Sequence, residues 1–260
     1  MSAPLRVALL GLGEAGSDIA ADLVAAGADV RGYDPKVTPA GGITARADEA
    51  DAVRDAELVL SVNSSHDALT ALTNALPGLA PGTIWADLNT ASPGVKAELV
   101  TTAAGAADVV DVALMSPVPG KGLRTPMLVS GEAAEGYAAM LRPLGAEVTV
   151  QPGPAGTAIS RKLLRSVFYK GLAAAVVEAL EGAKAAGCES WLAEDIASEL
   201  AGFTEDSLDR LVDGTHRHAR RRTDEMAAAA EQLRELEVEP RVATAAHDLL
   251  AAIRDQGGSA

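Results

Sequence analysis

The stretch LRVALLGLGEAGSDIAADLVAA, residues 5–26, decides the fold of this chain. Residues 5–10 are mostly aliphatic and predict a short buried strand, whereas residues 17–26 are typical of a helix. Between them lies G-x-G-x-x-G, with glycines at positions 11, 13 and 16. In that setting the first glycine makes a tight turn, the second lets a pyrophosphate approach the backbone, and the third allows close helix–strand packing. The stretch therefore predicts a dinucleotide-binding strand–turn–helix unit.

An acidic residue follows at the distance that this kind of site requires. A second strand, Val30 to Tyr33, is expected to end at Asp34, eighteen residues beyond Gly16. A carboxylate there accepts hydrogen bonds from a ribose and repels a 2′-phosphate, which favours NAD over NADP. Lys36 would soften that repulsion, so NADP stays open as the alternative. The residues predicted to contact the cofactor here are Gly11, Leu12, Gly13, Glu14, Ala15, Gly16 and Asp34.

Composition excludes several classes of partner. The chain has 260 residues, 48% of them hydrophobic and only 3% aromatic, so alanine, valine and leucine must fill its core. A net charge of −14 argues against nucleic acid or an anionic membrane as a partner. The single cysteine, Cys188, rules out an internal disulfide and fits a reducing compartment. We therefore expect a soluble, cytoplasmic protein with no membrane span and no metal site.

Strand and helix patterns alternate through the first 150 residues. Further strands are expected at 58–62, 84–86, 109–113, 127–130 and 147–150, and helices at 45–56, 67–76, 93–104 and 133–141. This alternation predicts an α/β domain with a mostly parallel, doubly wound Rossmann-type sheet.

The alternation stops at residues 151–154, and only helices are expected beyond them, at 155–186, 191–200, 205–212, 215–237 and 241–254. We predict a dinucleotide-binding domain over residues 1–152 and an all-helical substrate and dimerisation domain over residues 153–260. Residues 172–180 are apolar on nearly every side of their helix. Such a helix needs a core or a second subunit to cover it, so a homodimer is expected.

Small polar residues follow two of the predicted parallel strands, where ligands bind in sheets of this kind. Val62 and Asn63 end one strand, and Asn89 and Thr90 follow the next. These residues are predicted to contact the ribose and carboxamide of the cofactor. The alternative is that they only form turns, which Asn and Thr also favour.

A lysine near the start of the long helix is the candidate for proton transfer. Lys162 lies two turns beyond a glycine-rich turn, and Ser166 and Lys170 follow it at i, i+4 spacing. A lysine against an apolar surface and beside arginines would have a lowered pKa and exchange protons near neutral pH. The ordinary alternative is a solvated surface lysine.

Four motifs in this order resemble the β-hydroxyacid dehydrogenases, the relatives of 3-hydroxyisobutyrate and 6-phosphogluconate dehydrogenases. They are GLGEAG at 11–16, DLNTASP at 87–93, DVALMSPVPGKGLRTPMLVSG at 111–131 and GPAGTAISRK at 153–162. The resemblance is collinear over nearly the whole chain. It is strongest to a bacterial branch with a shortened C-terminal helical domain.

The resemblance implies an NAD(P)-dependent oxidoreductase that acts on a small β-hydroxyacid or its keto form. Lys162 matches the catalytic lysine of the family and would be the general acid/base. Thr90 would lie near the nicotinamide, and the loop at 116–122 near the carboxylate of the acidic substrate. The residues predicted to bind the substrate are Ser116, Gly120, Ser166 and Lys170.

Two departures from the family fall on substrate contacts. Ser166 stands where relatives usually carry an asparagine, and the loop MSPVPG at 115–120 replaces a serine and two glycines, so Ser116 matches only approximately. Two alternatives therefore stay open. One is an imine reductase-like enzyme, although such relatives typically replace the lysine that this chain keeps. The other is a nucleotide-binding protein without turnover.

Residues 216–222 (HRHARRR) form a dense basic cluster in an acidic chain. Within the expected 215–237 helix, i, i+4 spacing would place His216 with Arg220 and His218 with Arg222 on shared faces. Acidic neighbours favour a salt-bridged helix surface. The alternative is an anion clamp for an acidic substrate.

Overall fold

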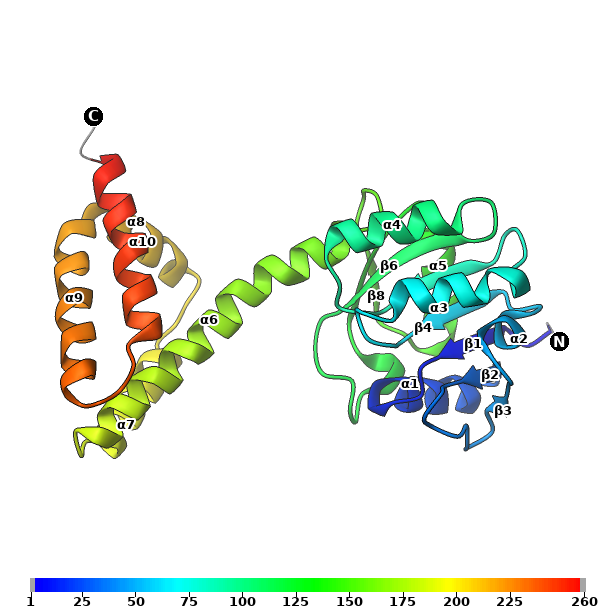
Figure 1. The fold of residues 1–260 in the computed structure, drawn as a ribbon, viewed down its shortest axis with the longest axis horizontal. Coiled ribbons are helices and arrows are strands. Elements are labelled where there is room, and N and C mark those ends of the chain that lie inside the picture. The colour runs from blue at the N-terminus through cyan, green and yellow to red at the C-terminus, as the bar shows by residue number, and fades with distance from the viewer. Residues whose placement is uncertain (1–2, 258–260) are drawn as a thin grey trace. The chain divides into compact units, whose positions relative to one another are not determined.

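The computed structural model describes residues 3–257 (Figure 1). The chain forms two compact units, residues 1–165 and residues 166–260.

The first unit is built on one sheet of eight strands. Its strands are β1 (Arg6–Leu10), β2 (Asp29–Tyr33), β3 (Thr44–Ala45), β4 (Leu58–Ser61), β5 (Ile84–Asp87), β6 (Asp108–Leu114), β7 (Met127–Ser130) and β8 (Val148–Val150). Their order in the sheet is β3-β2-β1-β4-β5-β6-β7-β8. All neighbours are parallel except β6 and β7. The predicted mostly parallel sheet is confirmed.

Helices cover both faces of this sheet. Ile19 and Leu23 of α1 (Glu14–Ala25) and Tyr137 of α5 (Ala134–Leu141) pack on one face. The other face is covered by α2 (Glu49–Val53), α3 (Ala68–Ala75) and α4 (Pro93–Ala103). The fully buried Trp85 of β5 lies in this second layer. The domain is therefore doubly wound, as the alternation of elements predicts.

The order of the strands fixes where a ligand can bind. From β1 the chain moves outward to β2 and β3, and then returns to the opposite side of β1 as β4. The carboxyl ends of β1 and β4 thus flank the point where the winding reverses, which is the usual ligand crevice of such sheets. The glycine turn at 11–16 directly follows β1 and lies at this point.

The predicted helix at 45–56 is wrong at both ends. Ala45 belongs to the two-residue edge strand β3, and the helix begins only at Glu49. Asp48 sets that start because its side chain accepts a hydrogen bond from the Asp51 N–H at 2.8 Å. The chain leaves the helical conformation again before Asp55, whose φ is +61°.

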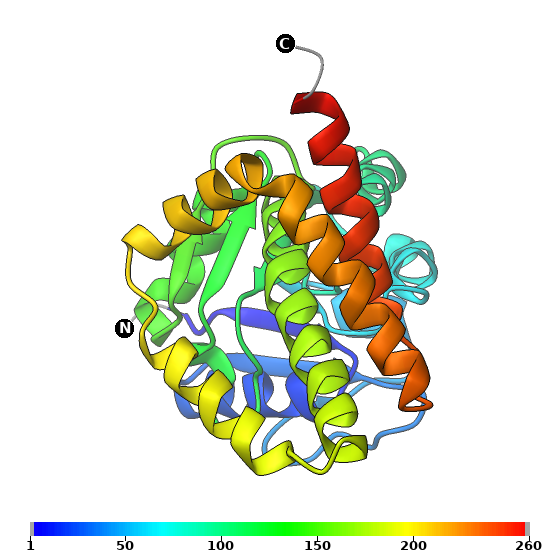
Figure 2. The ribbon, with the colours of Figure 1, turned by 90° about the vertical axis from the view of Figure 1, so that its left-hand side faces the viewer.

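The second unit is helical throughout the residues that the structure describes. It contains the later part of α6 (Thr157–Ala185), then α7 (Glu189–Ala201), α8 (Asp206–Arg217), α9 (Ala219–Glu235) and α10 (Arg241–Gly257). Helices α9 and α10 lie side by side (Figures 1 and 2). The buried Glu178 of α6 accepts hydrogen bonds from the N–H groups of Val242 and Ala243, both at 2.7 Å, and so fixes the start of α10. The predicted all-helical C-terminal region is confirmed.

Helix α6 contributes to both compact units. The sheet ends at Val150, close to the predicted domain boundary at residues 152–153, whereas the units divide at residues 165–166. The first turns of α6 stay with the sheet because Ala158 and Ile159 pack against Ala113 of β6. Over residues 3–257, no helix combines the length and the apolarity that a membrane crossing requires.

The predicted helix at 215–237 is wrong at its start, because α8 continues to Arg217 and α9 begins at Ala219. The break at His218 separates residues of the basic cluster that were expected to share one helix. Within α9, Arg221 pairs with Glu225 at 2.9 Å, as a salt-bridged surface requires. Across the break, Arg222 Nη1 donates to Thr215 Oγ1 at 2.5 Å.

Candidate cofactor and active site

The glycine turn presents backbone amides in an open space. Gly11 has a φ of +98° and donates its N–H to the carbonyl of Tyr33 at 3.0 Å, which ties the turn to β2. Gly13 is the N-cap of α1 and has no side chain to occupy the first N–H groups of that helix. A Cβ added at Gly13 would meet nothing within 4 Å. This arrangement fits a pyrophosphate, which helix N-termini bind through their amides.

Asp34 lies against the glycine turn, where it was predicted. One carboxylate oxygen accepts the Leu12 N–H at 2.7 Å, and the other accepts the N–H groups of Lys36 at 2.7 Å and Val37 at 3.0 Å. Burial raises the pKa of the Asp34 carboxyl, but the three hydrogen bonds and the charge of Lys36 outweigh burial and lower it overall. Asp34 is therefore an anion at neutral pH.

A cavity of 420 Å³ joins these predicted cofactor contacts. Its lining includes the glycine turn, the carboxylate at the end of β2 and the residues that follow β4; among these are Gly11, Gly13, Asp34, Val62 and Asn63. The cavity thus brings together residues from three separate segments that the sequence assigned to one ligand. It can hold the adenosine half of a dinucleotide.

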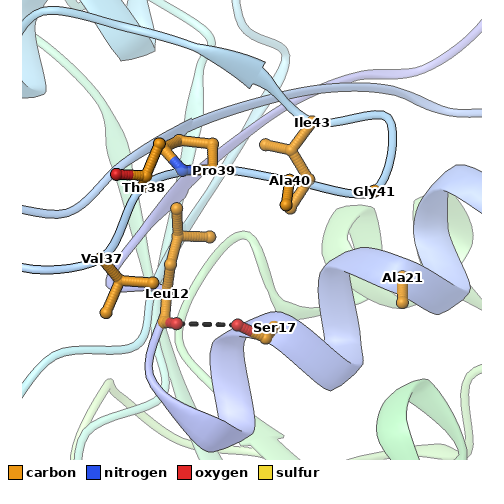
Figure 3. A pocket seen from close by; sticks show the side chains of 9 residues that line it. All are labelled: Leu12, Ser17, Ala21, Val37, Thr38, Pro39, Ala40, Gly41 and Ile43. Atoms are coloured by element: carbon orange, nitrogen blue, oxygen red, sulfur yellow. Dashed lines mark hydrogen bonds between the residues drawn. The ribbon is translucent and has the colours of Figure 1, made fainter.

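A second hollow, of 310 Å³, lies beside the same turn and is shown in Figure 3. Leu12, Ser17 and Ala21 line it from the turn and α1, and residues 37–43 close it with mostly apolar side chains. Ser17 Oγ donates to the Leu12 carbonyl at 2.7 Å, the dashed line in Figure 3. Asp34 and Asn63 line only the larger of these two cavities, so the predicted cofactor contacts lie together there.

Asn89, which follows β5, offers an acceptor to a ligand. Its Nδ2 donates to Asp87 Oδ1 at 2.5 Å and to Ser61 Oγ at 3.2 Å. Its Oδ1 is buried and has no hydrogen-bond partner among the described residues. A buried acceptor without a partner is costly, and a hydroxyl or amide group of a bound cofactor would satisfy it. The unpaired Asn89 Oδ1 therefore fits the binding of a dinucleotide.

The predicted catalytic lysine lies against the predicted nicotinamide contact. Lys162 Nζ donates to Thr90 Oγ1 at 3.0 Å, which links the second turn of α6 to the loop after β5. One turn further along α6, Arg165 Nη1 donates to the carbonyl of Met115 at 3.2 Å. Helix α6 thus touches both the loop after β5 and the start of the predicted substrate loop.

The predicted substrate loop is hydrogen-bonded to α1, the helix that follows the glycine turn. The Gly120 N–H donates to Asp18 Oδ2 at 3.2 Å and the Leu123 N–H to Asp22 Oδ2 at 2.9 Å, both aspartates being on α1. Ser116 Oγ accepts a hydrogen bond from Lys121 Nζ at 3.1 Å, which places a cation beside this serine. Asp18 and Asp22 could not be predicted from the sequence, because nothing in a helix sequence indicates which distant loop lies on it.

Ser166 and Lys170 belong to the part of α6 that lies in the second unit. Ser166 is half-buried and Lys170 is exposed. Their predicted role in substrate binding stays a prediction.

A buried charge cluster behind the site was also missed. Lys96 of α4 lies between Asp87 and Asp111, and all three side chains are fully buried. One signal was present in the sequence: Lys96 follows the cap Ser92-Pro93, and a cation in the first turn of a helix opposes the helix dipole unless it has a partner.

A parallel sheet with a glycine turn at its switch point and an acid after the second strand defines a dinucleotide-binding domain of the Rossmann type. Comparison with family models agrees. Residues 6–150 match the NAD binding domain of 6-phosphogluconate dehydrogenase, and the chain belongs to this family. Residues 183–253 match a domain of unknown function, DUF1932.

The chain is also similar to individual known proteins, and the share of the chain that each of them matches differs. A probable 3-hydroxyisobutyrate dehydrogenase of Mycobacterium bovis is 34% identical over 92 residues, which cover 33% of this chain and only 31% of that protein. A conserved protein described as structurally similar to 3-hydroxyacid dehydrogenases is 27% identical over 97% of this chain and 99% of its own, with a TM-score of 0.64. An imine reductase of Streptomyces aurantiacus has a TM-score of 0.81 at 18% identity, over 97% of this chain and 95% of its own.

These likenesses establish the general class of the protein. It is a distant homologue of 3-hydroxyisobutyrate dehydrogenase, with an NAD(P)-binding oxidoreductase fold of the 3-hydroxyacid dehydrogenase kind. The imine reductase shares the fold alone.

Proposed function

We propose that the protein is an NAD-dependent dehydrogenase that oxidises a small β-hydroxyacid or reduces the matching keto form. The observation that carries the proposal is the 3.0 Å contact between Lys162 Nζ and Thr90 Oγ1. This contact holds an amine at the carboxyl end of β5, on the same edge of the sheet as the glycine turn. An ammonium or amine so placed can exchange a proton with a substrate hydroxyl beside the cofactor.

The residues of this chain divide the work as follows. Gly13 and its neighbours hold the pyrophosphate, Asp34 holds the ribose, and Asn89 receives a hydrogen bond from the nicotinamide half. When bound, the nicotinamide supplies the redox chemistry. Lys162 takes the proton from the substrate hydroxyl, or returns it to the carbonyl oxygen in the reverse direction. Ser116 holds the substrate carboxylate, and Lys121 beside Ser116 supports an anionic substrate. Gly120 shapes this loop, because its N–H donates to Asp18 of α1 and is not left for the substrate.

A substrate panel tests the proposal. The purified protein is given NAD⁺ or NADP⁺ with small β-hydroxyacids, and the reduced cofactors with β-ketoacids and cyclic imines, while the absorbance of reduced nicotinamide is followed. We expect turnover of β-hydroxyacids or their keto forms, faster with NAD than with NADP. Turnover of imines alone would assign an imine reductase instead. Thermal stabilisation by cofactor without any turnover would leave a nucleotide-binding protein that is not an enzyme.

Replacing Asp34 tests the preference for NAD. In Asp34→Ser the carboxylate that repels a 2′-phosphate is gone, so the ratio of kcat/KM for NADP to that for NAD is expected to rise by about tenfold or more. Asp34→Asn is the matched control for size. Its Oδ1 can still accept from Lys36 and Val37, while its Nδ2 can no longer accept from Leu12. If neither variant changes the ratio of the two cofactors, Asp34 does not contact the ribose.

We further propose that two copies of the chain associate through their helical units. Several apolar side chains of α6 are exposed, with 73% of Val167, 53% of Phe168 and 56% of Val177 accessible. Trp191 of α7 and Leu208 of α8 are also more than half exposed, at 64% and 67%. Apolar surface in this amount supports burial against a partner, and a second copy would supply the same surface.

A further inference from the structure

A lysine without any accessible surface joins two aspartates behind the proposed site. Lys96 Nζ lies 2.5 Å from Asp87 Oδ2, 2.9 Å from the Asp87 carbonyl oxygen and 3.2 Å from Asp111 Oδ1. Two of these contacts, both to Asp87, are hydrogen bonds, and the contact with Asp111 is an ion pair. Asp87 ends β5 and Asp111 lies in β6, so this one side chain ties two neighbouring strands to α4.

The second oxygen of Asp111 holds the beginning of α6. It accepts the N–H groups of Gly156 at 3.0 Å and Ile159 at 2.9 Å. Ser130 Oγ donates to the same carboxylate at 3.3 Å and accepts the Ala158 N–H at 2.9 Å. A carboxylate at a helix N-terminus satisfies free amides and the positive end of the helix dipole. Asp111 therefore fixes where α6 starts, and Lys162 lies one turn beyond Ile159.

Asp87 fixes the other side of the proposed proton-transfer contact. Its Oδ1 accepts the hydrogen bond from Asn89 Nδ2, and Asn89 directly precedes Thr90. Thr90 is the residue that Lys162 touches. Both sides of the Lys162–Thr90 contact are thus held by buried carboxylates. Asp111 holds the helix that carries Lys162, and Asp87 holds the loop that carries Thr90.

The two carboxylates need the ammonium to remain charged side by side. Burial raises the pKa of the Asp87 carboxyl, and the negative charge of Asp111 raises it further. Lys96 and the Asn89 amide act against this increase. Without the ammonium, one carboxylate must take up a proton or the two must move apart. Either change would alter the hydrogen bonds that hold the start of α6 or the loop after β5.

We propose that Lys96 is a positioning residue of this enzyme: by bridging Asp87 and Asp111 it sets the geometry in which Lys162 meets Thr90. The inference rests on the proposed function of Lys162. The ammonium of Lys96 contacts Asp87 and Asp111, so Lys96 acts through the two carboxylates.

Two variants isolate the role of Lys96. Asp87→Asn keeps an oxygen for Asn89 and keeps the pair between Lys96 and Asp111. Adding Lys96→Met to it removes the ammonium with little change of volume and leaves a single buried carboxylate, that of Asp111, which still accepts the N–H groups at the start of α6. Comparing the double variant with Asp87→Asn therefore reports the loss of the pair between Lys96 and Asp111, and comparing Asp87→Asn with the wild type reports the loss of the pair between Lys96 and Asp87. Lys96→Gln, which can donate to either carboxylate, replaces the double variant should that one fail to fold.

Three quantities are measured for each variant: the Kd for NAD⁺, kcat on the substrate found in the panel, and the NMR titration of Lys162 in cofactor-free protein whose lysines carry ¹³C-methyl groups. Lys162→Arg assigns the resonance. We expect NAD⁺ binding within about threefold of Asp87→Asn and kcat lower by about tenfold to a hundredfold, because small displacements of catalytic groups have effects of that size. The Lys162 resonance and its titration midpoint should change, while those of the exposed Lys184 stay unchanged.

An unchanged kcat and an unchanged Lys162 titration in a folded variant would show that Lys96 only fills the core. Parallel losses of NAD⁺ affinity, kcat and thermal stability, with the Lys162 titration unchanged, would do the same. If the wild-type protein turns over none of the panel, the proposed function fails. The NMR titration still decides whether Lys96 positions Lys162, because it needs neither substrate nor cofactor.

Discussion

Lys162→Ala is expected to lower kcat by about a thousandfold while the Kd for NAD⁺ changes by less than about threefold. General acid–base groups contribute factors of roughly 10² to 10⁴, and no other ammonium among the described residues contacts Thr90. Cofactor affinity should survive because the proposed contacts to the adenosine half, the glycine turn and Asp34, lie on other segments. Steady-state kinetics and a direct NAD⁺ titration measure the two quantities separately.

Two further variants separate proton transfer from charge. Lys162→Arg keeps a cation beside Thr90 but cannot release its proton near neutral pH, so its kcat should fall nearly as far as that of the alanine variant. Lys184→Ala removes an exposed lysine from the same helix and should leave kcat unchanged. An arginine variant with nearly full activity would mean that Lys162 acts through charge alone. A fully active alanine variant would remove Lys162 from the mechanism.

Gly16→Ala should have a large effect on stability. A Cβ at Gly16 would lie 2.0 Å from the carbonyl oxygen of Gly11, and neither backbone segment can yield without moving α1 from β1. Overpacking of this kind costs about 3 kcal/mol, so we expect a decrease in Tm of roughly 10 °C. Calorimetry of the cofactor-free protein measures that decrease.

Gly13→Ala is the matched variant, since it adds the same methyl group three residues away. Nothing lies within 4 Å of the added Cβ, and the φ of −63° suits any residue, so Tm should change by less than about 2 °C. Affinity for NAD⁺ should instead fall by about tenfold or more, because the methyl group occupies the space of the pyrophosphate. Equal affinities for Gly13→Ala and wild type would place the pyrophosphate elsewhere.

The cofactor half of the site was predictable because its geometry is local. Three glycines within six residues, between a strand and a helix, determine the turn, and the strand that follows places Asp34 on it. The contact of Lys162 with Thr90 was reached differently, through two motifs 72 residues apart that resemble one family. Spacing along the chain alone does not bring them together.

The parts that the sequence analysis missed depend on tertiary contacts. Apart from the position of Lys96 in the first turn of its helix, Lys96 and Asp111 look like ordinary charges of a helix and a strand, and the packing of α4 on the sheet shows that they are buried and paired. The break between α8 and α9 at His218 could not be predicted from the sequence either. Residues 215–237 contain neither glycine nor proline, the residues that usually mark the end of a helix. The edge strand β3 is only two residues long, too short for a periodic pattern.

The scarcity of aromatic side chains gives each compact unit a single indole, Trp85 in the sheet and Trp191 on α7. Trp85 is buried and Trp191 is exposed to solvent, so their fluorescence emission differs in wavelength and in access to quenchers. Denaturation of the two halves can consequently be followed as separate optical signals in a single unlabelled molecule, with Trp191→Phe assigning the remaining emission to the sheet.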